Sequence, residues 1–228
     1  MLIIKKIKNL SKKACTVINK KIITKVRRNN MKTNLIEKEQ AVFVIDMNNG
    51  FCEEGALADK GIKRIVPEII QIIRNNMENN GALFIVNDKH TKDSVELKRY
   101  PEHCYTEEES RTIKELKIYE EYADALFYKN STCALFAPNV MPTLISMTNL
   151  KRVVIVGCCT DICIKNFAIA LRNFFDEINY DVEVVVYKDA VETFDNDLHK
   201  REKCNEIAFQ DMENNGIKLV RSKEREGR

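Results

Sequence analysis

The chain has 228 residues, of which 44% are hydrophobic and 31% are charged, and its formal net charge is +3. This length and apolar content predict one globular domain with a sizeable core. No apolar run approaches the length of a membrane span, which excludes an integral membrane protein and predicts a soluble one. The eight cysteines form no CxxC pair and no convincing secretory signal is present, so we expect free thiols in a reducing, cytoplasmic setting.

The charge is distributed unevenly along the chain. Residues 1–40 hold twelve Lys or Arg and two acidic residues, a balance of +10, whereas the remainder, with 25 basic and 32 acidic residues, carries −7. Residues 1–30 contain no acidic residue and alternate apolar clusters with lysines, as an amphipathic helix on an anionic surface does. Three interpretations stay open: a targeting or surface-binding segment, a functionally minor arm, and an upstream extension of a protein that starts at Met31.

These features divide the chain into three parts. We expect a basic extension over 1–35 that is disordered or non-native, a folded domain over 36–222, and a charged tail over 223–228. The extension has no interleaved aromatic residues, so no nucleic-acid partner is expected.

The folded part alternates two kinds of segment. Six short runs made largely of apolar residues predict strands at 41–45, 82–86, 125–128, 153–156, 182–187 and 217–220. Helical spacing of apolar residues predicts helices at 62–78, 107–118, 139–148, from Cys163 onward, and at 197–214. Because parallel neighbours need a helical crossover, this alternation predicts an α/β fold with a three-layer, doubly wound parallel sheet of about six strands.

The helix at 107–118 is predicted from its first turn. Thr106 and Glu109 have the spacing of a capping box. Ile113, Leu116 and Ile118 would then face the core.

The segment VVIVGCCTDICI, residues 153–164, predicts a central strand that Gly157 ends. Thr160 and Asp161 are suitable N-cap residues for a following helix that opens at Cys163. A thiol at that position faces free amide groups and the positive end of the helix dipole, which would lower its pKa and favour a thiolate. The alternative is that Cys163 is a small buried apolar residue.

Chemically active side chains follow four of the predicted strands. Asp46 ends the first, Asp88 and His90 follow the second, Lys129 ends the third, and Cys163 lies past the fourth. Taken singly, each has an ordinary structural role as a cap, a solvated strand end or a loop polar residue. Because ligands of such sheets bind outside the carboxyl ends of the strands, we expect all five to meet in one crevice.

Together these residues have what nucleophilic catalysis requires. Asp46 can accept the proton of the Cys163 thiol, and Lys129 can stabilise the thiolate and keep the carboxylate ionised.

The segment DKHTKDSVELKRYPEH, residues 88–103, adds a candidate metal site. Asp88, His90, Glu96 and His103 are oxygen and imidazole ligands suited to one divalent ion, zinc first, with iron or manganese as alternatives. His103 could equally be a hydrogen-bonding loop residue. The third histidine of the chain, His199, is predicted to be a surface or capping residue.

At these motifs the chain resembles the isochorismatase-like cysteine hydrolases, within them the nicotinamidase branch. The resemblance covers roughly 41–220, in the family's order: VFVIDMNNGF resembles its first strand, DKHTKDSVELKRYPEHC its metal loop, YKNSTCALF its lysine segment and GCCTDICI its nucleophile turn. It implies a catalytic triad of Asp46, Lys129 and Cys163. It also implies that Asp88, His90 and His103 bind the metal, with Glu96 at a variable fourth position.

The resemblance further implies the surroundings of the substrate. The peptide bond between Cys158 and Cys159 would be cis, and the backbone amides of Cys159 and Cys163 would form an oxyanion hole. Phe51 and Tyr100 match positions that sandwich a flat ring, although both could be ordinary core aromatics. The chain departs from the family in having Cys158 and Cys159 in the turn and Tyr100 where Trp is usual.

The implied activity is hydrolysis of nicotinamide to nicotinate and ammonia through a cysteine thioester, a reaction of NAD salvage. Alternatives are another small carboxamide, a vinyl ether as in isochorismatase, or a catalytically idle binding or scaffold member. Expected partners are the small carboxamide, one divalent ion and further copies of the chain in a homo-oligomer, with no membrane for the domain.

Overall fold

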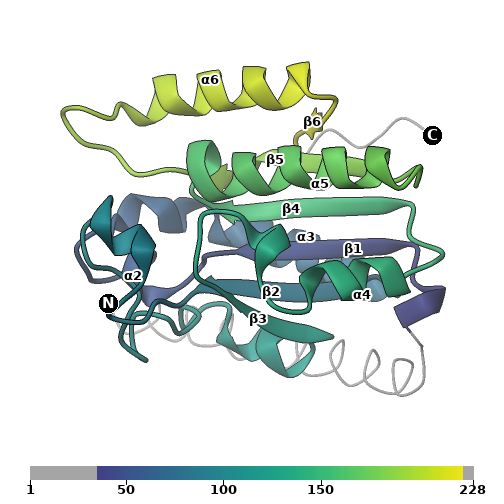
Figure 1. Ribbon diagram of the computed structural model, residues 1–228, viewed down its shortest axis with the longest axis horizontal. Helices are drawn as coiled ribbons and strands as arrows, with labels where there is room; N and C mark the ends of the chain where they lie inside the picture. Colours follow the sequence, from purple (N-terminus) through teal and green to yellow (C-terminus); the bar gives the residue numbers. More distant parts are fainter. Residues whose placement is uncertain (1–34, 223–228) are drawn as a thin grey trace, which may run out of the picture. The chain divides into compact units, whose positions relative to one another are not determined.

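The computed structural model describes residues 35–222, so the predictions for residues 1–34 and for the tail at 223–228 lie outside the described residues. The strands are β1 (Gln40–Ile45), β2 (Ala82–Asp88), β3 (Ala125–Lys129), β4 (Arg152–Cys158), β5 (Glu183–Glu192) and β6 (Lys218–Val220). They form one parallel sheet in the order β3-β2-β1-β4-β5-β6 (Figure 1). The predicted α/β class and the doubly wound parallel sheet are confirmed.

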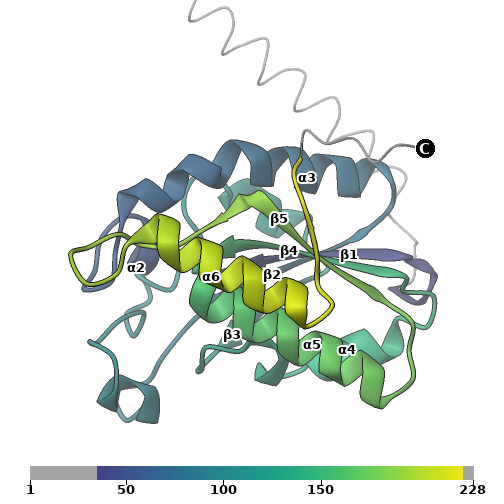
Figure 2. The same ribbon diagram turned by 90° about the horizontal axis from the view of Figure 1, so that it is seen from above.

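Helices cover both faces of this sheet. They are α2 (Asn49–Cys52), α3 (Val66–Glu78), α4 (Val140–Ser146), α5 (Lys165–Glu177) and α6 (Arg201–Asn214). Figure 2 shows α3 on one side of the sheet and α4, α5 and α6 on the other, which makes the three predicted layers. Within residues 35–222, no helix is long and apolar enough to cross a membrane.

The larger core lies between the sheet and α4, α5 and α6. Its central residue is Phe43, which lies in register with Phe84 on β2 and Ile155 on β4. The Phe43 ring centroid is 4.8 Å from that of Phe84 and 5.2 Å from that of Phe167 on α5. Removing these rings from water stabilises the face of the sheet that α4, α5 and α6 cover.

Three strands extend two or more residues further than predicted, and the first of them is β2, which ends at Asp88. β4 continues through Gly157 to Cys158, and β5 continues to Glu192. Gly157 does not end the strand: its φ is +118°, and the pairing with β5 shifts register there. A Cβ at this position would lie 2.0 Å from the carbonyl oxygen of Ile45, so only glycine lets β4 approach β1 so closely.

The predicted helix at 107–118 is wrong. This segment is a series of turns followed by a short 3₁₀ helix, Lys117–Glu121. Half of the capping box does form, because Thr106 Oγ1 accepts a hydrogen bond from the Glu109 amide at 3.2 Å. However, the Glu109 carbonyl accepts a hydrogen bond from the Gly50 amide, and the Arg111 carbonyl accepts one from the Asn49 amide. These carbonyls are therefore not available for the hydrogen bonds of a helix.

The three residues predicted to face the core from this segment are not all buried. Ile113 and Leu116 are buried as predicted, whereas Ile118 is exposed. The backbone hydrogen bonds from Asn49 and Gly50 to this segment hold α2 beside the carboxyl end of β1.

Candidate active site

The predicted catalytic residues meet at the carboxyl edge of the sheet. Lys129 is the last residue of β3, and its Nζ lies 2.9 Å from Asp46 Oδ2, just past β1. The same Nζ lies 3.0 Å from Asp88 Oδ1, at the end of β2, and 3.6 Å from Cys163 Sγ. All four side chains are buried. One ammonium group therefore contacts a thiol and two carboxylates from three other segments of the chain.

The turn that carries the thiol differs from its prediction in detail. Thr160–Ile164 forms a π-helical turn between β4 and α5, so Cys163 precedes the α-helix rather than opening it. Neither Thr160 nor Asp161 caps α5. Instead, the Cys159 carbonyl accepts hydrogen bonds from the amides of Ile162 and Ile164, both at 3.1 Å.

The peptide bond between Cys158 and Cys159 is cis, as the resemblance implied. The role of the Cys159 and Cys163 amides as an oxyanion hole stays a prediction.

Burial dominates the electrostatics of the triad. It raises the pKa of Asp46 to about 6, because Lys129 offsets only part of the loss of solvation. A hydrogen bond to Cys163 contributes a smaller lowering. Burial also raises the pKa of the Cys163 thiol well above its usual range, against the opposing charge of Lys129.

The predicted lowering of the Cys163 pKa is therefore wrong. The thiol does not lie at the end of α5, and it is buried near the carboxylates of Asp46 and Asp88. A protonated thiol beside a carboxylate that titrates near neutrality is arranged for proton transfer from sulfur to Asp46.

The four predicted metal ligands form one buried cluster. Ligand atoms of Asp88, His90, Glu96 and His103 all lie within 4.8 Å of one another. Asp88 Oδ2 is 3.0 Å from His90 Nε2 and 3.2 Å from His103 Nε2. The side chain of Asp88 thus contacts both parts of the site, with Oδ1 on Lys129 and Oδ2 on the histidines.

The hydrogen bonds behind these histidines test whether the cluster fits a metal. His103 Nδ1 lies 2.7 Å from the carbonyl oxygen of Pro101, which can only accept, so Nδ1 carries the proton. His90 Nδ1 lies 2.7 Å from Asn130 Oδ1, which also accepts from Ser94 Oγ at 2.7 Å. Each Nε2 of a neutral ring therefore directs a lone pair toward a carboxylate.

A lone pair that faces a carboxylate repels it, so a proton or a metal ion has to lie between each Nε2 and Asp88. Outer hydrogen bonds of this kind orient the imidazole ligands of metal sites. The side chains at this position fit a divalent ion.

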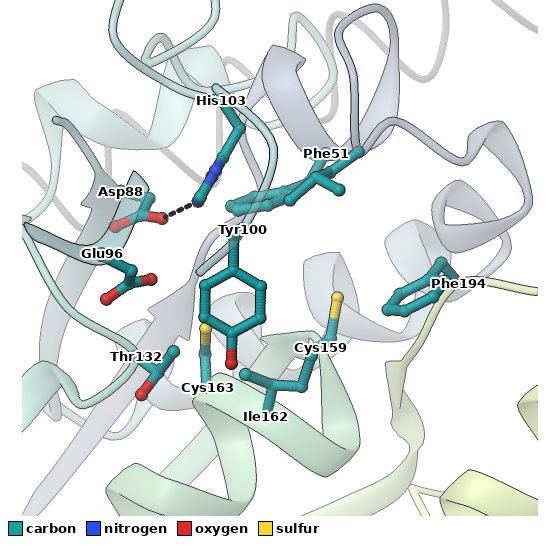
Figure 3. A pocket seen from close by; sticks show the side chains of 11 residues that line it. Phe51, Asp88, Glu96, Tyr100, His103, Thr132, Cys159, Ile162, Cys163 and Phe194 are labelled. Atoms are coloured by element: carbon teal, nitrogen blue, oxygen red, sulfur yellow. Dashed lines mark ion pairs between the residues drawn. The ribbon is translucent and has the colours of Figure 1, made fainter. Parts of the chain in front are cut away.

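A pocket opens above the triad and the metal cluster (Figure 3). Its lining consists of Phe51, Leu57, Asp88, Glu96, Tyr100, His103, Thr132, Cys159, Ile162, Cys163 and Phe194. In Figure 3, Tyr100 projects across the pocket, and the sulfur of Cys163 points into it from below. The ring centroids of Phe51 and Tyr100 lie 5.5 and 6.4 Å from that of His103, so both predicted aromatic residues flank the metal cluster.

Local sequence explains the position of Phe51. Asn48 is the N-cap of α2, and its Oδ1 accepts from the Phe51 amide at 3.3 Å. The sequence NNG predicts a turn here, whereas the structure forms a single helical turn that directs Phe51 into the pocket.

The sequence did not indicate Phe194, which lines the pocket on the side away from Asp88 and Glu96 (Figure 3). The predicted strand ended at 187, but β5 continues to Glu192 and brings Phe194 to the same edge of the sheet. The available clue was the apolar pair Ala190 and Val191, which prolongs the strand pattern.

The interpretation of His199 as a surface or capping residue is also wrong. Its ring stacks on Phe194, with centroids 3.8 Å apart, and its Nε2 lies 2.7 Å from Asp161 Oδ2.

Curated relatives share most of this domain. Nicotinamidase 1 of Arabidopsis thaliana is 29% identical over 173 residues, covering 68% of this chain and 70% of the relative. A second Arabidopsis thaliana protein, named a probable inactive nicotinamidase, is 26% identical over 192 residues, covering 79% and 91% of the two chains.

Solved structures share the fold. The crystal structure of the pyrazinamidase of Pyrococcus horikoshii in complex with zinc superimposes with a TM-score of 0.62 at 22% identity, covering 80% of this chain and 99% of that one. The family model described as the isochorismatase domain matches residues 40–223, which span the whole sheet, the triad and the metal cluster. The chain belongs to the isochorismatase family.

Proposed function

We propose that this protein is a cysteine amidohydrolase, and specifically a nicotinamidase that converts nicotinamide and water to nicotinate and ammonia. It would thus cleave the carbon–nitrogen bond of a linear amide. One observation carries the proposal: Lys129 Nζ contacts Asp46, Asp88 and Cys163 within 2.9 to 3.6 Å at the base of an aromatic-lined pocket. A nucleophile, a base and a cation in contact are the parts that acyl transfer requires.

The first half-reaction begins with proton transfer from Cys163 to Asp46. The thiolate attacks the carboxamide carbon, while the ammonium of Lys129 stabilises the negative charge. The backbone amides of Cys159 and Cys163 would donate to the oxyanion of the tetrahedral intermediate. Asp46 then returns the proton to the leaving nitrogen, and ammonia departs.

The second half-reaction hydrolyses the thioester between the acyl group and Cys163. With ammonia gone, Asp46 is a carboxylate again and can remove a proton from an attacking water. The raised pKa of Asp46, about 6, suits a group that acts first as acceptor, then as donor, then as acceptor again near neutral pH.

The remaining walls suit a flat heteroaromatic amide. Phe51, Tyr100 and Phe194 present ring surfaces, whereas Asp88, Glu96 and His103 form one polar end. A divalent ion held by Asp88, His90, Glu96 and His103, zinc in analogy to the Pyrococcus horikoshii pyrazinamidase, would supply a Lewis acid that binds and orients the ring nitrogen.

The test is ammonia release from nicotinamide by purified wild-type protein, before and after chelation, beside two cysteine variants. Cys163→Ala should abolish turnover, whereas Cys133→Ala, which removes another buried thiol, should retain it. Turnover should fall on chelation and return with zinc, iron or manganese. Activity that survives in Cys163→Ala would refute the mechanism.

Other functions give different results in the same assay. If the metal-loaded, reduced wild type does not hydrolyse nicotinamide but hydrolyses another small carboxamide, the proposed mechanism stands and only the proposed substrate changes. An isochorismatase-type activity on a vinyl ether is disfavoured by the complete ligand cluster, because that branch works without a metal. An idle member, as one Arabidopsis thaliana relative is named, would turn over none of these substrates; the intact triad argues against it.

We place the reaction in the cytoplasm. The free thiols among residues 35–222, with seven cysteines unpaired, support a reducing compartment. The homo-oligomeric state stays a prediction.

A further inference from the structure

A second cluster of metal-ligating side chains lies outside the triad and the first metal cluster. It consists of Asp161 in the nucleophile turn, His199 in the segment between β5 and α6, and Cys204 on α6. One ligand atom of each residue lies within 4.8 Å of the others. All three residues are partly buried, so the cluster can bind an ion and still admit water to complete its coordination.

The histidine of this cluster is oriented as those of the first cluster are. His199 Nδ1 lies 3.1 Å from the carbonyl oxygen of Phe194, which can only accept, so Nδ1 carries the proton. His199 Nε2 then faces Asp161 Oδ2 at 2.7 Å. His103 has the same arrangement, with Nδ1 on the Pro101 carbonyl and Nε2 on Asp88.

The carboxylate is oriented as well. Asp161 Oδ1 accepts a hydrogen bond from Thr193 Oγ1 at 2.6 Å, so Oδ2 is the oxygen that faces His199 and is available to a cation. Both potential ligands therefore have an outer hydrogen bond that fixes the direction of the ligating atom. Partners of this kind accompany the ligands of natural metal sites and raise their affinity.

We propose that Asp161, His199 and Cys204 form a second divalent-metal site, selective for a thiophilic ion such as Zn²⁺. Thiolate, imidazole and carboxylate together are a zinc donor set, and water would occupy the fourth position. Magnesium and calcium, which prefer oxygen ligands, would bind poorly. The proposal does not depend on the substrate of the enzyme.

The spacing of the ligand atoms is compatible with zinc after small movements. Zinc bonds of about 2.0 to 2.3 Å in a tetrahedral site place ligand atoms about 3.3 to 3.8 Å apart. The contact between Asp161 and His199 would have to widen by roughly 0.6 Å from 2.7 Å, and the sulfur of Cys204 would have to approach by about 1 Å if it lies at the 4.8 Å limit. Side-chain rotation supplies movements of this size.

An ion at this position would join α6 to two segments that line the substrate pocket. Asp161 is two residues before Cys163, and the His199 ring stacks on Phe194 with an interplanar angle of 16°. Phe194 and Ile162 both line the pocket. Binding would therefore hold the Phe194 wall and the nucleophile turn in a fixed relation.

The test uses Co²⁺ as a spectroscopic substitute for zinc, added to the metal-free full-length chain in the Cys163→Ala background. The first cluster contains no thiolate, so thiolate-to-cobalt charge-transfer absorption in the near ultraviolet reports the second site. We expect this absorption to saturate at the intensity of one cobalt–thiolate bond per chain, to disappear in an added Cys204→Ser substitution, and to remain in the matched control Cys133→Ser. Zinc should displace the cobalt and abolish the absorption.

A second measurement keeps the proposal testable without the spectrum. Zinc should slow alkylation of Cys204 by iodoacetamide at least tenfold, as measured by mass spectrometry of the peptide, and His199→Gln should abolish this protection. The second site would be overturned if the Cys163→Ala protein showed no charge-transfer band, or if the band persisted after Cys204→Ser. Equal alkylation rates of Cys204 with and without zinc would also overturn it. None of these outcomes depends on turnover, so they are distinct from a failure of the proposed amidase activity.

Discussion

Lys129 and Asp88 form a buried ion pair, 3.0 Å from Nζ to Oδ1, that joins the candidate catalytic residues to the candidate metal ligands. Through its other oxygen, Asp88 contacts His90 and His103. Burial by itself raises the pKa of Asp88, but Lys129 and the two histidines outweigh burial and hold this pKa well below its usual range. Asp88 therefore stays ionised, and its charge affects both halves of the site.

The first prediction concerns the cation at the centre. Lys129→Met keeps the length of the side chain but leaves the buried carboxylates of Asp46 and Asp88 without their shared partner. We expect the free energy of unfolding to fall by about 3 to 5 kcal/mol, as measured by urea denaturation at pH 7. Turnover of folded protein should fall by about 10²-fold or more, because the charge that stabilises the reacting sulfur is lost.

A matched control is available at the opposite edge of the sheet. Lys38 is also buried and forms an ion pair of 2.9 Å with Asp124, before β1 begins. Lys38→Met should destabilise the fold while leaving kcat/KM within about twofold of the wild type. Equal losses of activity in both variants would show that Lys129 acts only through stability.

The second prediction is the pH dependence of activity. Asp46 must be ionised to accept the thiol proton, and its pKa is raised to about 6. Its ionised fraction is therefore complete well above pH 6 and is lost as the pH falls through 6. The logarithm of kcat/KM, measured for metal-loaded protein, should decrease with a slope of about one per pH unit below pH 6. A level profile down to pH 5 would exclude Asp46 as the base, and Asp46→Asn should be inactive at every pH.

The third prediction concerns the residue behind His90. Asn130 Oδ1 lies 2.7 Å from His90 Nδ1 and Ser94 Oγ lies 3.1 Å from it, so Asn130→Ala removes the nearer of the two groups that orient the ring. The dissociation constant for zinc, measured by competition with a chromophoric chelator, should rise about 10- to 100-fold. Asn166→Ala removes a nearby amide that donates to Thr132 instead and should leave the dissociation constant unchanged. The activity of Asn130→Ala should recover at saturating zinc. Equal zinc dissociation constants for Asn130→Ala and Asn166→Ala would contradict the proposal that Asn130 orients the His90 ring.

The fourth prediction concerns the aromatic wall. Phe194→Ala removes a ring that lines the pocket, and its loss should weaken substrate binding by about 1.4 kcal/mol, which is tenfold in KM, with a smaller change in kcat. Phe136→Ala is the control, because that ring is 67% exposed and does not line the pocket. If KM of Phe194→Ala stays at the wild-type value, the ring contributes nothing to binding.

The sequence by itself determined the class of fold and most of the site. Uniformly apolar strands such as VVIV, alternating with amphipathic helices, can be buried only in a covered parallel sheet, and this alternation was sufficient to predict the architecture. Because strand ends share one edge in such a sheet, Asp46, Asp88, Lys129 and Cys163 were expected to converge, and they do. His90 and His103 also lie together as predicted, because both belong to the same short loop.

Only the tertiary structure decided the features that depend on long-range pairing and burial. The segment 107–118 has helical spacing, yet its carbonyls are used by α2, which is distant in the sequence. The pKa of Cys163 is raised because burial outweighs the charge of Lys129, and burial cannot be read from neighbouring residues. Phe194 and His199 reach the site because β5 extends past its predicted end. In each case local sequence specifies which conformations are favourable, whereas contacts with distant segments select among them.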